Sequence, residues 1–420
     1  MKVSIVGGGV IGLCCAYYLN KEGYEVTVID RNNITDGCSF GNMGYISPSH
    51  FIPLASPGII RQGLKWMLSS SSPFYIQPRL NLDLIRWGLT FRKSANERKM
   101  QENIPHLNNL LQLSRHLMND LKNEFPDSFD MIERGCWALF KNLKTGDHEK
   151  QLAEEATKLG LRTEICNPEE VQKYEPEVEV NVAGGVLWLD DCHLNSAKFM
   201  RTLYSHLQEN GVRFVLNTEV KNFAGKSVGV RNNGSIHSIV TAKEKITADE
   251  IIIANGSWMP AVAKMAGIHL LMQPGKGYSV VYENMEKNLQ HPAILIEDRT
   301  AMTPIDHWLR IGGTMELSGH SENVLPKRVN AIYNAVKKYF PSLTISEPPP
   351  DKTWYGYRPV TPDGLPYIGR HSKYSNLLFA GGHAMLGLSA AAGTGKLIQE
   401  IIDRKKTSID LSAFRIERFS

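Results

Sequence analysis

The first thirty residues alternate between short apolar runs and glycine-rich or polar breaks. Residues 2–6 form an apolar run of strand length, residues 10–21 have the spacing of a buried helix, and residues 25–30 form a second apolar run that ends in a carboxylate. A glycine turn separates the first run from the helix. Strand, turn, helix and strand in this order predict a βαβ unit with parallel strands.

Helical patterns recur further along the chain. Between residues 81 and 125, apolar residues fall at the three- and four-residue spacing of helices, and we expect them to form a helical cap with buried apolar side chains. These side chains are Leu82, Leu84, Ile85, Trp87, Leu89, Leu107, Leu110, Leu111, Leu113, Leu117 and Leu121. Residues 196–210 predict another helix, and a last helix should begin near Leu388.

Strand patterns dominate the second half. Short apolar and β-branched runs predict strands at 212–216, 218–220, within 226–247, at 250–253, within 265–350 and at 376–381. The turn Asn232-Asn233-Gly234 predicts a hairpin. The strand ending at 253 precedes a small-residue turn, and in a doubly wound sheet such strand ends lie beside the ligand crevice.

The composition is that of an ordinary globular protein. With 420 residues, of which 42% are hydrophobic and 21% charged, the chain is long enough for two domains. The net charge is +4 without a run of five basic residues, so no nucleic acid partner is indicated. The six cysteines contain no CxxC pair, which predicts no metal site and favours a reducing, cytoplasmic setting.

The glycine turn has the spacing of a dinucleotide-binding fingerprint. Gly7 allows the tight turn, Gly9 lets the backbone approach a pyrophosphate, and Gly12 allows close packing of the helix on the strand. The phosphate charge would lie at the helix N-terminus. Asp30 is placed to accept hydrogen bonds from a ribose and would repel a 2′-phosphate, which disfavours NADP. The fingerprint alone leaves FAD and NAD as alternatives.

Four further segments carry glycine-rich or small-residue patterns. They are the loop at 39–48, Gly-Lys-Gly-Tyr-Ser at 275–279, Gly-Tyr-Arg-Pro-Val-Thr-Pro-Asp-Gly at 356–364, and Gly-Gly-His followed by Gly387 at 381–387. Together with the N-terminal fingerprint, and in this order, they resemble the small subunits of D-amino acid dehydrogenases. That family is similar to glycine oxidases, sarcosine oxidases and D-amino acid oxidases, which are flavoproteins.

The resemblance implies FAD and an α/β fold. A Rossmann-like FAD-binding domain, expected at residues 1–50, 150–260 and 352–420, would be interleaved with a strand-rich α+β substrate domain at 51–149 and 261–351 that carries the helical cap. The residues expected to bind FAD are Gly7, Gly9, Val10, Ile11, Gly12, Asp30, Arg31, Ser39, Asn42, Met43, Gly44, Val220, Ala254, Gly256, Gly382, His383, Leu386, Gly387 and Leu388.

Arg358, Tyr278 and His383 are the catalytic candidates, and Arg310 is a reserve candidate for the carboxylate clamp. By the resemblance, Arg358 clamps the substrate carboxylate, and a guanidinium fork suits that task because it binds a carboxylate bidentately. Tyr278 either donates its hydroxyl to the same carboxylate or packs in the core. Arg310 is a second clamp candidate or an exposed strand arginine. His383 either contacts the flavin or the substrate amine, or is a structural histidine.

The implied reaction is hydride transfer from the α-carbon of a D-amino acid to flavin N5, giving an imino acid that hydrolyses to a 2-oxo acid and ammonia. The amine must be neutral to release the hydride, and bulk water or His383 could take its proton. The N-terminus of the last helix would stabilise negative charge on the flavin. Residues 393–396 imitate a phosphate loop but lack its first glycine and its Ser or Thr.

The electron acceptor is open. No second complete fingerprint is present, so a pyridine nucleotide is not expected, whereas the resemblance suggests a quinone or another acceptor reached from the membrane surface, or oxygen. We expect a cytoplasmic protein without a transmembrane segment, peripheral to the inner face of the cell membrane. Alternative functions are a D-hydroxyproline or D-proline dehydrogenase, a glycine or sarcosine oxidase, an NAD-binding regulator, or a non-catalytic flavin-carrying subunit.

Overall fold

A six-stranded sheet carries the N-terminal glycine turn. In the computed structural model, which describes residues 1–35, 37–67, 72–225 and 234–419, β1 is the central strand of this sheet. In spatial order the strands are β19 (Tyr367–Arg370), β20 (Leu377–Gly381), β13 (Glu250–Ile253), β1 (Lys2–Val6), β2 (Glu25–Ile29) and β9 (Arg213–Val215). All pairs are parallel except β19 with β20. With α1 (Val10–Lys21) between β1 and β2, the predicted βαβ unit is confirmed.

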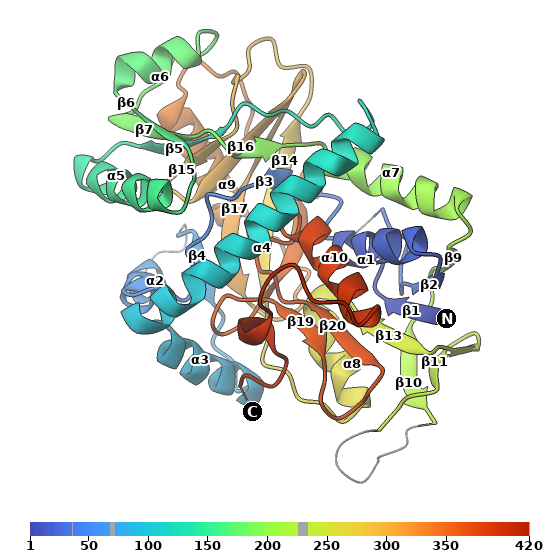
Figure 1. Ribbon diagram of the computed structural model, residues 1–420. Coiled ribbons are helices and arrows are strands. Elements are labelled where there is room, and N and C mark those ends of the chain that lie inside the picture. Colours follow the sequence, from blue (N-terminus) through green and yellow to red (C-terminus); the bar gives the residue numbers. More distant parts are fainter. Residues whose placement is uncertain (36, 68–71, 226–233, 420) are drawn as a thin grey trace.

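Helices cover one face of this sheet. In Figure 1, α1 and α10 (Ala391–Ile402) lie side by side, and the long helix α4 (Glu97–Glu124) crosses them. The small residues of α10 allow this close approach, because a β-carbon at Gly395 would lie 2.6 Å from the backbone carbon of Cys14. The glycines that imitate a phosphate loop therefore serve helix packing. The core between these helices and the sheet includes Ile5, Leu13 and Leu397.

A second, larger sheet of nine strands stands above the first (Figure 1). In spatial order it contains β18 (Trp354–Val360), β14 (Gln273–Tyr282), β17 (Trp308–Leu317), β16 (Thr300–Ile305), β15 (Ala293–Leu295), β5 (Cys136–Phe140), β7 (Gly184–Trp188) and β6 (Thr163–Cys166), while β4 (Phe74–Ile76) pairs with β17. Most pairs are antiparallel, and α9 (Pro326–Tyr339) packs on this sheet.

The membership of three strands differs from the sequence-based boundaries. We expected residues 150–260 and 352–420 to belong with the glycine turn, but β7 pairs with β5, β6 pairs with β7, and β18 pairs with β14, all in the nine-stranded sheet. The strands β5 and β7 are buried along their whole length, so no alternating pattern marked which sheet they join. The division into an FAD-binding and a substrate domain remains our proposal, with residues 150–190 and 352–360 moved to the substrate side.

Smaller elements connect the two sheets. The remaining helices are α2 (Ile59–Met67), α3 (Leu82–Ser94), α5 (Leu143–Lys158), α6 (Pro168–Tyr174), α7 (Ser196–Glu209) and α8 (Met259–Met265), with short 3-10 turns at Gly256–Trp258, Pro350–Lys352 and Ser412–Phe414. A two-stranded sheet pairs β3 (Tyr45–Ile46) with β8 (Cys192–His193), and a three-stranded sheet contains β10 (Val220–Ala224), β11 (Ser238–Thr241) and β12 (Lys245–Thr247).

The predicted hairpin turn at residues 232–233 lies outside the described residues. Across the described ranges, no helix has the length and apolarity needed to cross a membrane.

The predicted helical cap is present, but one of its faces is not core. In α4, Leu107, Leu110, Leu111 and Leu121 are buried as expected. In α3, the inner face presents Trp87 to the core, whereas Leu82, Ile85 and Leu89 are 72%, 49% and 57% exposed. The expectation that these three residues are core was wrong, because the helical spacing recurs on both faces of α3 and gives no sign of which face is covered.

Candidate active site

A cavity of about 1660 Å³ is lined by residues of both large sheets. Its volume exceeds the roughly 300–1,000 Å³ of ordinary ligand pockets, which leaves room for a dinucleotide and a second small molecule. The sequence-predicted residues in its wall are Gly7, Gly9, Val10, Ile11, Asp30, Arg31, Ser39, Asn42, Met43, Gly44, Val220, Ala254, Gly256, Tyr278, Arg358, His383, Leu386, Gly387 and Leu388. Gly12 and Gly382 do not line it and lie behind the wall.

The glycine turn fits a pyrophosphate. Gly7 has φ +113°, and a β-carbon there would lie 2.6 Å from the carbonyl oxygen of Ala254. At Gly12 a β-carbon would lie 1.9 Å from the carbonyl oxygen of Gly7, so only glycine lets α1 begin this close to β1. The first-turn N–H groups of α1 have no partners within the helix and can bind anionic oxygens at this end.

Asp30 has a role that the sequence did not reveal. Its carboxylate accepts hydrogen bonds from the backbone N–H of Gly8 at 2.7 Å and of Asn32 at 2.9 Å. The side chain at the end of β2 therefore fixes the shape of the glycine turn. Asp30 also lines the cavity, so its predicted contact with a ribose stays a proposal that this geometry permits.

The loop that follows β2 is held by side chains from distant strands. The hydroxyl of Thr303 donates to the carbonyl of Met43 at 2.6 Å, and the guanidinium of Arg310 donates to the carbonyl of Asn42. Ser39 accepts a hydrogen bond from the N–H of Val10 at 3.0 Å. Arg310 does not line the cavity. It is thus neither the second clamp nor an exposed arginine, because its buried head positions this loop.

Arg358 lies in the wall of the cavity on the strand β18. Its guanidinium donates to the carbonyl of Thr314 at 2.7 Å and forms no ion pair with any carboxylate in the described ranges. Burial lowers the pKa of Arg358. Gly277 on the neighbouring strand makes space for it, because a β-carbon there would lie 2.0 Å from the guanidinium. A half-buried guanidinium without a counter-ion favours binding of an anion.

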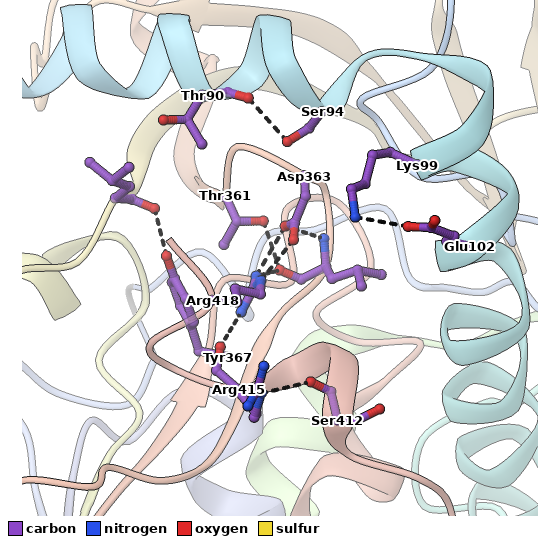
Figure 2. Close-up of polar contacts among 12 residues, drawn as sticks. Thr90, Ser94, Lys99, Glu102, Thr361, Asp363, Tyr367, Ser412, Arg415 and Arg418 are labelled. Carbon is purple, nitrogen blue, oxygen red and sulfur yellow. Dashed lines mark hydrogen bonds and ion pairs between the residues drawn. The ribbon is translucent and has the colours of Figure 1, made fainter. Parts of the chain in front are cut away.

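The turn that follows Arg358 is held by Arg418. Figure 2 shows the guanidinium of Arg418 against Asp363, with hydrogen bonds of 2.7 and 3.0 Å to the two carboxylate oxygens. Arg418 also donates to the carbonyl of Leu365 at 2.6 Å, and the hydroxyl of Thr361 donates to the same carbonyl at 2.7 Å. This bidentate pair is nearly buried. The aspartate of the 356–364 motif therefore serves to fasten the segment that carries Arg358.

Tyr278 is occupied by a buried charged cluster. Its hydroxyl donates to a carboxylate oxygen of Glu316 at 2.8 Å and accepts from the N–H of Leu325 at 3.2 Å. The same carboxylate lies 3.4 Å from the ammonium of Lys276 and 3.5 Å from the guanidinium of Arg328. Of the two alternatives, the geometry favours packing over a donor role toward substrate, because the single hydroxyl proton points at Glu316.

His383 is buried beside the cavity at the start of the C-terminal turn. Its Nε2 lies 2.9 Å from the hydroxyl of Thr394, and burial lowers its pKa to about 3. The imidazole is therefore neutral at physiological pH and a poor proton acceptor. The last helix begins at Ala391 rather than near Leu388, so the turn residues, and not the helix, line the cavity here. Gly382, with φ +84°, packs against Thr361 behind the wall.

Two groupings of cavity residues could not be seen in the sequence, although Arg31 itself was expected at the cofactor. The guanidinium of Arg31 lies 3.8 Å above the ring of Trp258, and these two residues are brought together only by the fold. Ser49, His50 and Asp191 form a hydrogen-bonded chain in another part of the wall. Because 141 or more residues separate Asp191 from the other two, no local motif could have shown it.

Comparison with known proteins decides the family. Residues 2–401 match the family model described as FAD dependent oxidoreductase. The chain belongs to the FAD-dependent oxidoreductase family. This oxidoreductase is 31% identical over 430 residues to a D-amino acid dehydrogenase of Granulibacter bethesdensis, with all of both chains covered. It is 32% identical over 409 residues to a D-amino acid dehydrogenase of Helicobacter pylori, with 95% of this chain and 94% of the relative covered.

Solved structures share the fold of this FAD-dependent oxidoreductase. A glycine oxidase from Geobacillus kaustophilus matches with a TM-score of 0.78 and 21% identity, covering 100% of this chain and 98% of that one. The L-proline dehydrogenase from P. horikoshii matches with a TM-score of 0.77 and 20% identity, covering 100% and 97%. The resemblance that the motifs indicated, the fold class and the cofactor FAD are thereby confirmed.

Proposed function

We propose that this protein oxidises D-amino acids to 2-oxo acids and ammonia. The observation that carries the proposal is Arg358, a cavity guanidinium without a carboxylate partner in the described part of the chain. The relatives named D-amino acid dehydrogenase, similar along the whole chain, support the choice of substrate class. A flavin-carrying subunit without catalysis would have no use for an unpaired cation in the cavity wall.

Different residues would bind the substrate and the cofactor. The guanidinium of Arg358 binds the substrate carboxylate and fixes the direction of the α-carbon hydrogen. The N-terminus of α1 and the turn at Gly7 hold the pyrophosphate of FAD, and Asp30 its ribose. Bound FAD supplies the acceptor for the hydride. The loop at Met43 and the turn at Leu386 both contribute to the wall of this cavity.

An anaerobic substrate panel tests the proposal. The purified holoenzyme is mixed with D- and L-amino acids, D-hydroxyproline, D-proline, glycine and N-methylglycine, and the visible absorption of the flavin is recorded. We expect bleaching by D-amino acids and not by their L-enantiomers, with stoichiometric release of a 2-oxo acid. The cyclic D-imino acids are the main alternative substrates.

Three results would contradict the proposal. A protein without bound flavin would remove the basis for any redox function. Bleaching by none of the compounds would refute oxidation of amines, and equal bleaching by both enantiomers would refute the stereochemical assignment.

We further propose that the electron acceptor is a quinone reached from the inner face of the membrane. The support is the outer face of α3, where Leu82, Ile85 and Leu89 lie on one exposed stripe. Exposed Arg86, Arg92 and Lys93 flank the stripe, and none of them forms an ion pair with a described residue. An apolar stripe between cations is typical of helices that lie on anionic lipid. The opposite face of α3 contributes to the cavity wall, so docking would bring the cavity to the membrane surface.

Changing this stripe should weaken membrane binding. We expect the triple variant Leu82→Glu, Ile85→Glu, Leu89→Glu to lower binding to vesicles of phosphatidylcholine and phosphatidylglycerol by roughly tenfold or more, because it removes apolar contact and adds charge repelled by the lipid. Cosedimentation measures the effect. Leu143→Glu, which changes another exposed leucine on α5, is the matched control and should bind as the wild type does. Equal binding by the triple variant would refute docking through α3.

A further inference from the structure

Three side chains in the cavity wall form a continuous hydrogen-bonded chain. The hydroxyl of Ser49 donates to Oδ2 of Asp191 at 2.6 Å, and the same hydroxyl lies 3.0 Å from Nδ1 of His50. The backbone N–H of Ser49 donates to Oδ1 of Asp191 at 3.0 Å. Ser49 and Asp191 are buried, His50 is half-buried, and all three line the cavity that also contains Arg358.

The direction of these hydrogen bonds fixes the tautomer of His50. An ionised carboxylate only accepts, so the single proton of the Ser49 hydroxyl points at Asp191. The hydroxyl oxygen can then only accept from His50, which requires the proton of the neutral imidazole to be on Nδ1. Nε2 of His50 is left as an acceptor, and no hydrogen-bond partner for it occurs in the described part of the chain.

We propose that His50, Ser49 and Asp191 form a proton relay that takes the proton from the substrate ammonium group before the hydride is transferred. This inference rests on the proposed function. It assigns the base that the reaction needs and that neither the sequence nor His383 supplies. His50 is the catalytic residue of the relay, because it would contact the amine, and Ser49 and Asp191 act through it.

The proton balance of the step is closed within the chain. The ammonium nitrogen loses a proton to Nε2 of His50, Nδ1 of His50 gives its proton to the Ser49 oxygen, and the Ser49 proton passes to Oδ2 of Asp191. The imidazole changes tautomer and remains neutral, the serine is unchanged, and Asp191 becomes a carboxylic acid. The substrate amine is then neutral, as hydride release from the α-carbon to bound FAD requires.

The pKa values of His50 and Asp191 suit their places at the two ends of this relay. Burial, together with the positive charge of Arg299, lowers the pKa of His50 to about 4, so the imidazole stays neutral and shuttles the proton rather than keeping it. Burial raises the pKa of Asp191 to about 7, as does the neighbouring Asp190, while the bonds from Ser49 oppose the rise. A carboxyl group with this pKa can both accept a proton from the relay and release it.

Other ionisable groups near Asp191 do not compete for the proton. The phenol of Tyr45 on β3 and the thiols of Cys136 on β5 and Cys192 on β8 have raised pKa values because they are buried, so they stay protonated. Asp190 is turned outward, where its carboxylate accepts from Arg162. In the part of the chain that the structure describes, Asp191 has no ion pair with a cation.

The test is the pH dependence of flavin reduction, followed anaerobically by stopped flow with a D-amino acid that bleaches the wild type. The relay works only while Asp191 is ionised, so the rate for the wild type should rise as the pH increases through about 7 and then level off. In Asp191→Asn and His50→Gln only substrate with an already neutral amine reacts. We expect their rates at neutral pH to fall by roughly 100-fold or more. The pH at which the rate of flavin reduction rises should shift upward, to the pKa of the substrate's own ammonium group.

Two variant pairs separate a relay from a structural role. Ser49→Ala breaks the chain and should show the displaced pH profile, whereas Ser49→Thr keeps the hydroxyl and should restore the profile. Asp190→Asn changes the adjacent, outward-turned carboxylate and is the matched control for Asp191→Asn, with a profile close to that of the wild type. Flavin absorption and thermal unfolding of each variant show whether the site is intact.

The outcomes distinguish this inference from the proposed function. A wild type that no amine reduces would refute the proposed function itself. A reducible wild type whose Asp191→Asn and His50→Gln variants hold FAD and keep the wild-type pH profile would overturn the relay alone. Displaced profiles in these two variants and in Ser49→Ala, with a normal profile in Ser49→Thr, would support it.

Discussion

Replacing Arg358 by alanine should raise KM for the amino acid by roughly 30- to 4,000-fold, the equivalent of about 2–5 kcal/mol for a charge pair that loses one partner. The expected effect is large because the guanidinium is half-buried in the cavity wall and has no carboxylate of its own among the described residues. The substrate carboxylate would then enter the cavity without a counter-ion. Steady-state kinetics of the FAD-loaded variant, with wild-type absorption as the check on folding, measures the change.

Arg358→Lys is the matched variant for this prediction. It keeps the positive charge but loses the planar fork that binds both carboxylate oxygens, so its KM should lie between those of the wild type and Arg358→Ala. An unchanged KM in the alanine variant would contradict the assignment of the clamp. Arg310 could not simply replace it, because its head is held by the carbonyl of Asn42 and the hydroxyl of Ser196.

Replacing Gly12 by alanine should weaken the binding of FAD. The new β-carbon would lie 1.9 Å from the carbonyl oxygen of Gly7, and a backbone atom cannot move aside as the end of a side chain can. Overpacking costs about 1–3 kcal/mol. Because this strain falls on the glycine turn that would hold the pyrophosphate, we expect FAD to bind roughly 5- to 150-fold more weakly. Titration of the apoprotein with FAD, followed by flavin fluorescence, measures the affinity.

Gly88→Ala is the control for this substitution. Gly88 lies within α3, and a β-carbon there would have no atom within 4 Å. The control should bind FAD as the wild type does and gain slightly in stability, because alanine is a better helix former than glycine. Normal FAD binding by Gly12→Ala would show that α1 can move away from β1, and would refute the close packing as the reason for glycine at this position.

The fold could be predicted where local pattern and topology agree. The βαβ unit follows from the spacing of Gly7 and Gly12 and from two apolar runs, and β1, α1 and β2 appear within a residue of their expected ends. The sheet to which β7 belongs could not be predicted, because a strand buried along its whole length looks alike in either sheet. The outer face of α3 was misjudged for a related reason, since periodicity predicts a helix but not what covers it.

The candidate site also contains residues that the sequence could reveal and residues that it could not. Arg358 and the glycines stand in motifs with characteristic spacing, and the structure places Gly7, Gly9 and Arg358 in the wall of one cavity. Asp191 has no motif, and its hydrogen bond to Ser49 joins positions 142 residues apart. Tyr278 and Arg310 were plausible ligands by residue type alone. Their actual partners, Glu316 and the loop carbonyl of Asn42, come from strands and loops that only the folded chain brings together.

The central position of β1 sets a requirement on synthesis in the cell. The neighbour of β1 on one side, β13, begins 248 residues after β1 begins. At about 5–20 residues per second, the ribosome needs roughly 12 to 50 seconds to make the intervening chain. During that interval the apolar strand Val3–Val6 has β2 as its only sheet neighbour, and its open edge is a template for wrong pairing with other nascent chains. We therefore expect the nascent protein to benefit from a chaperone that covers this strand until β13 emerges.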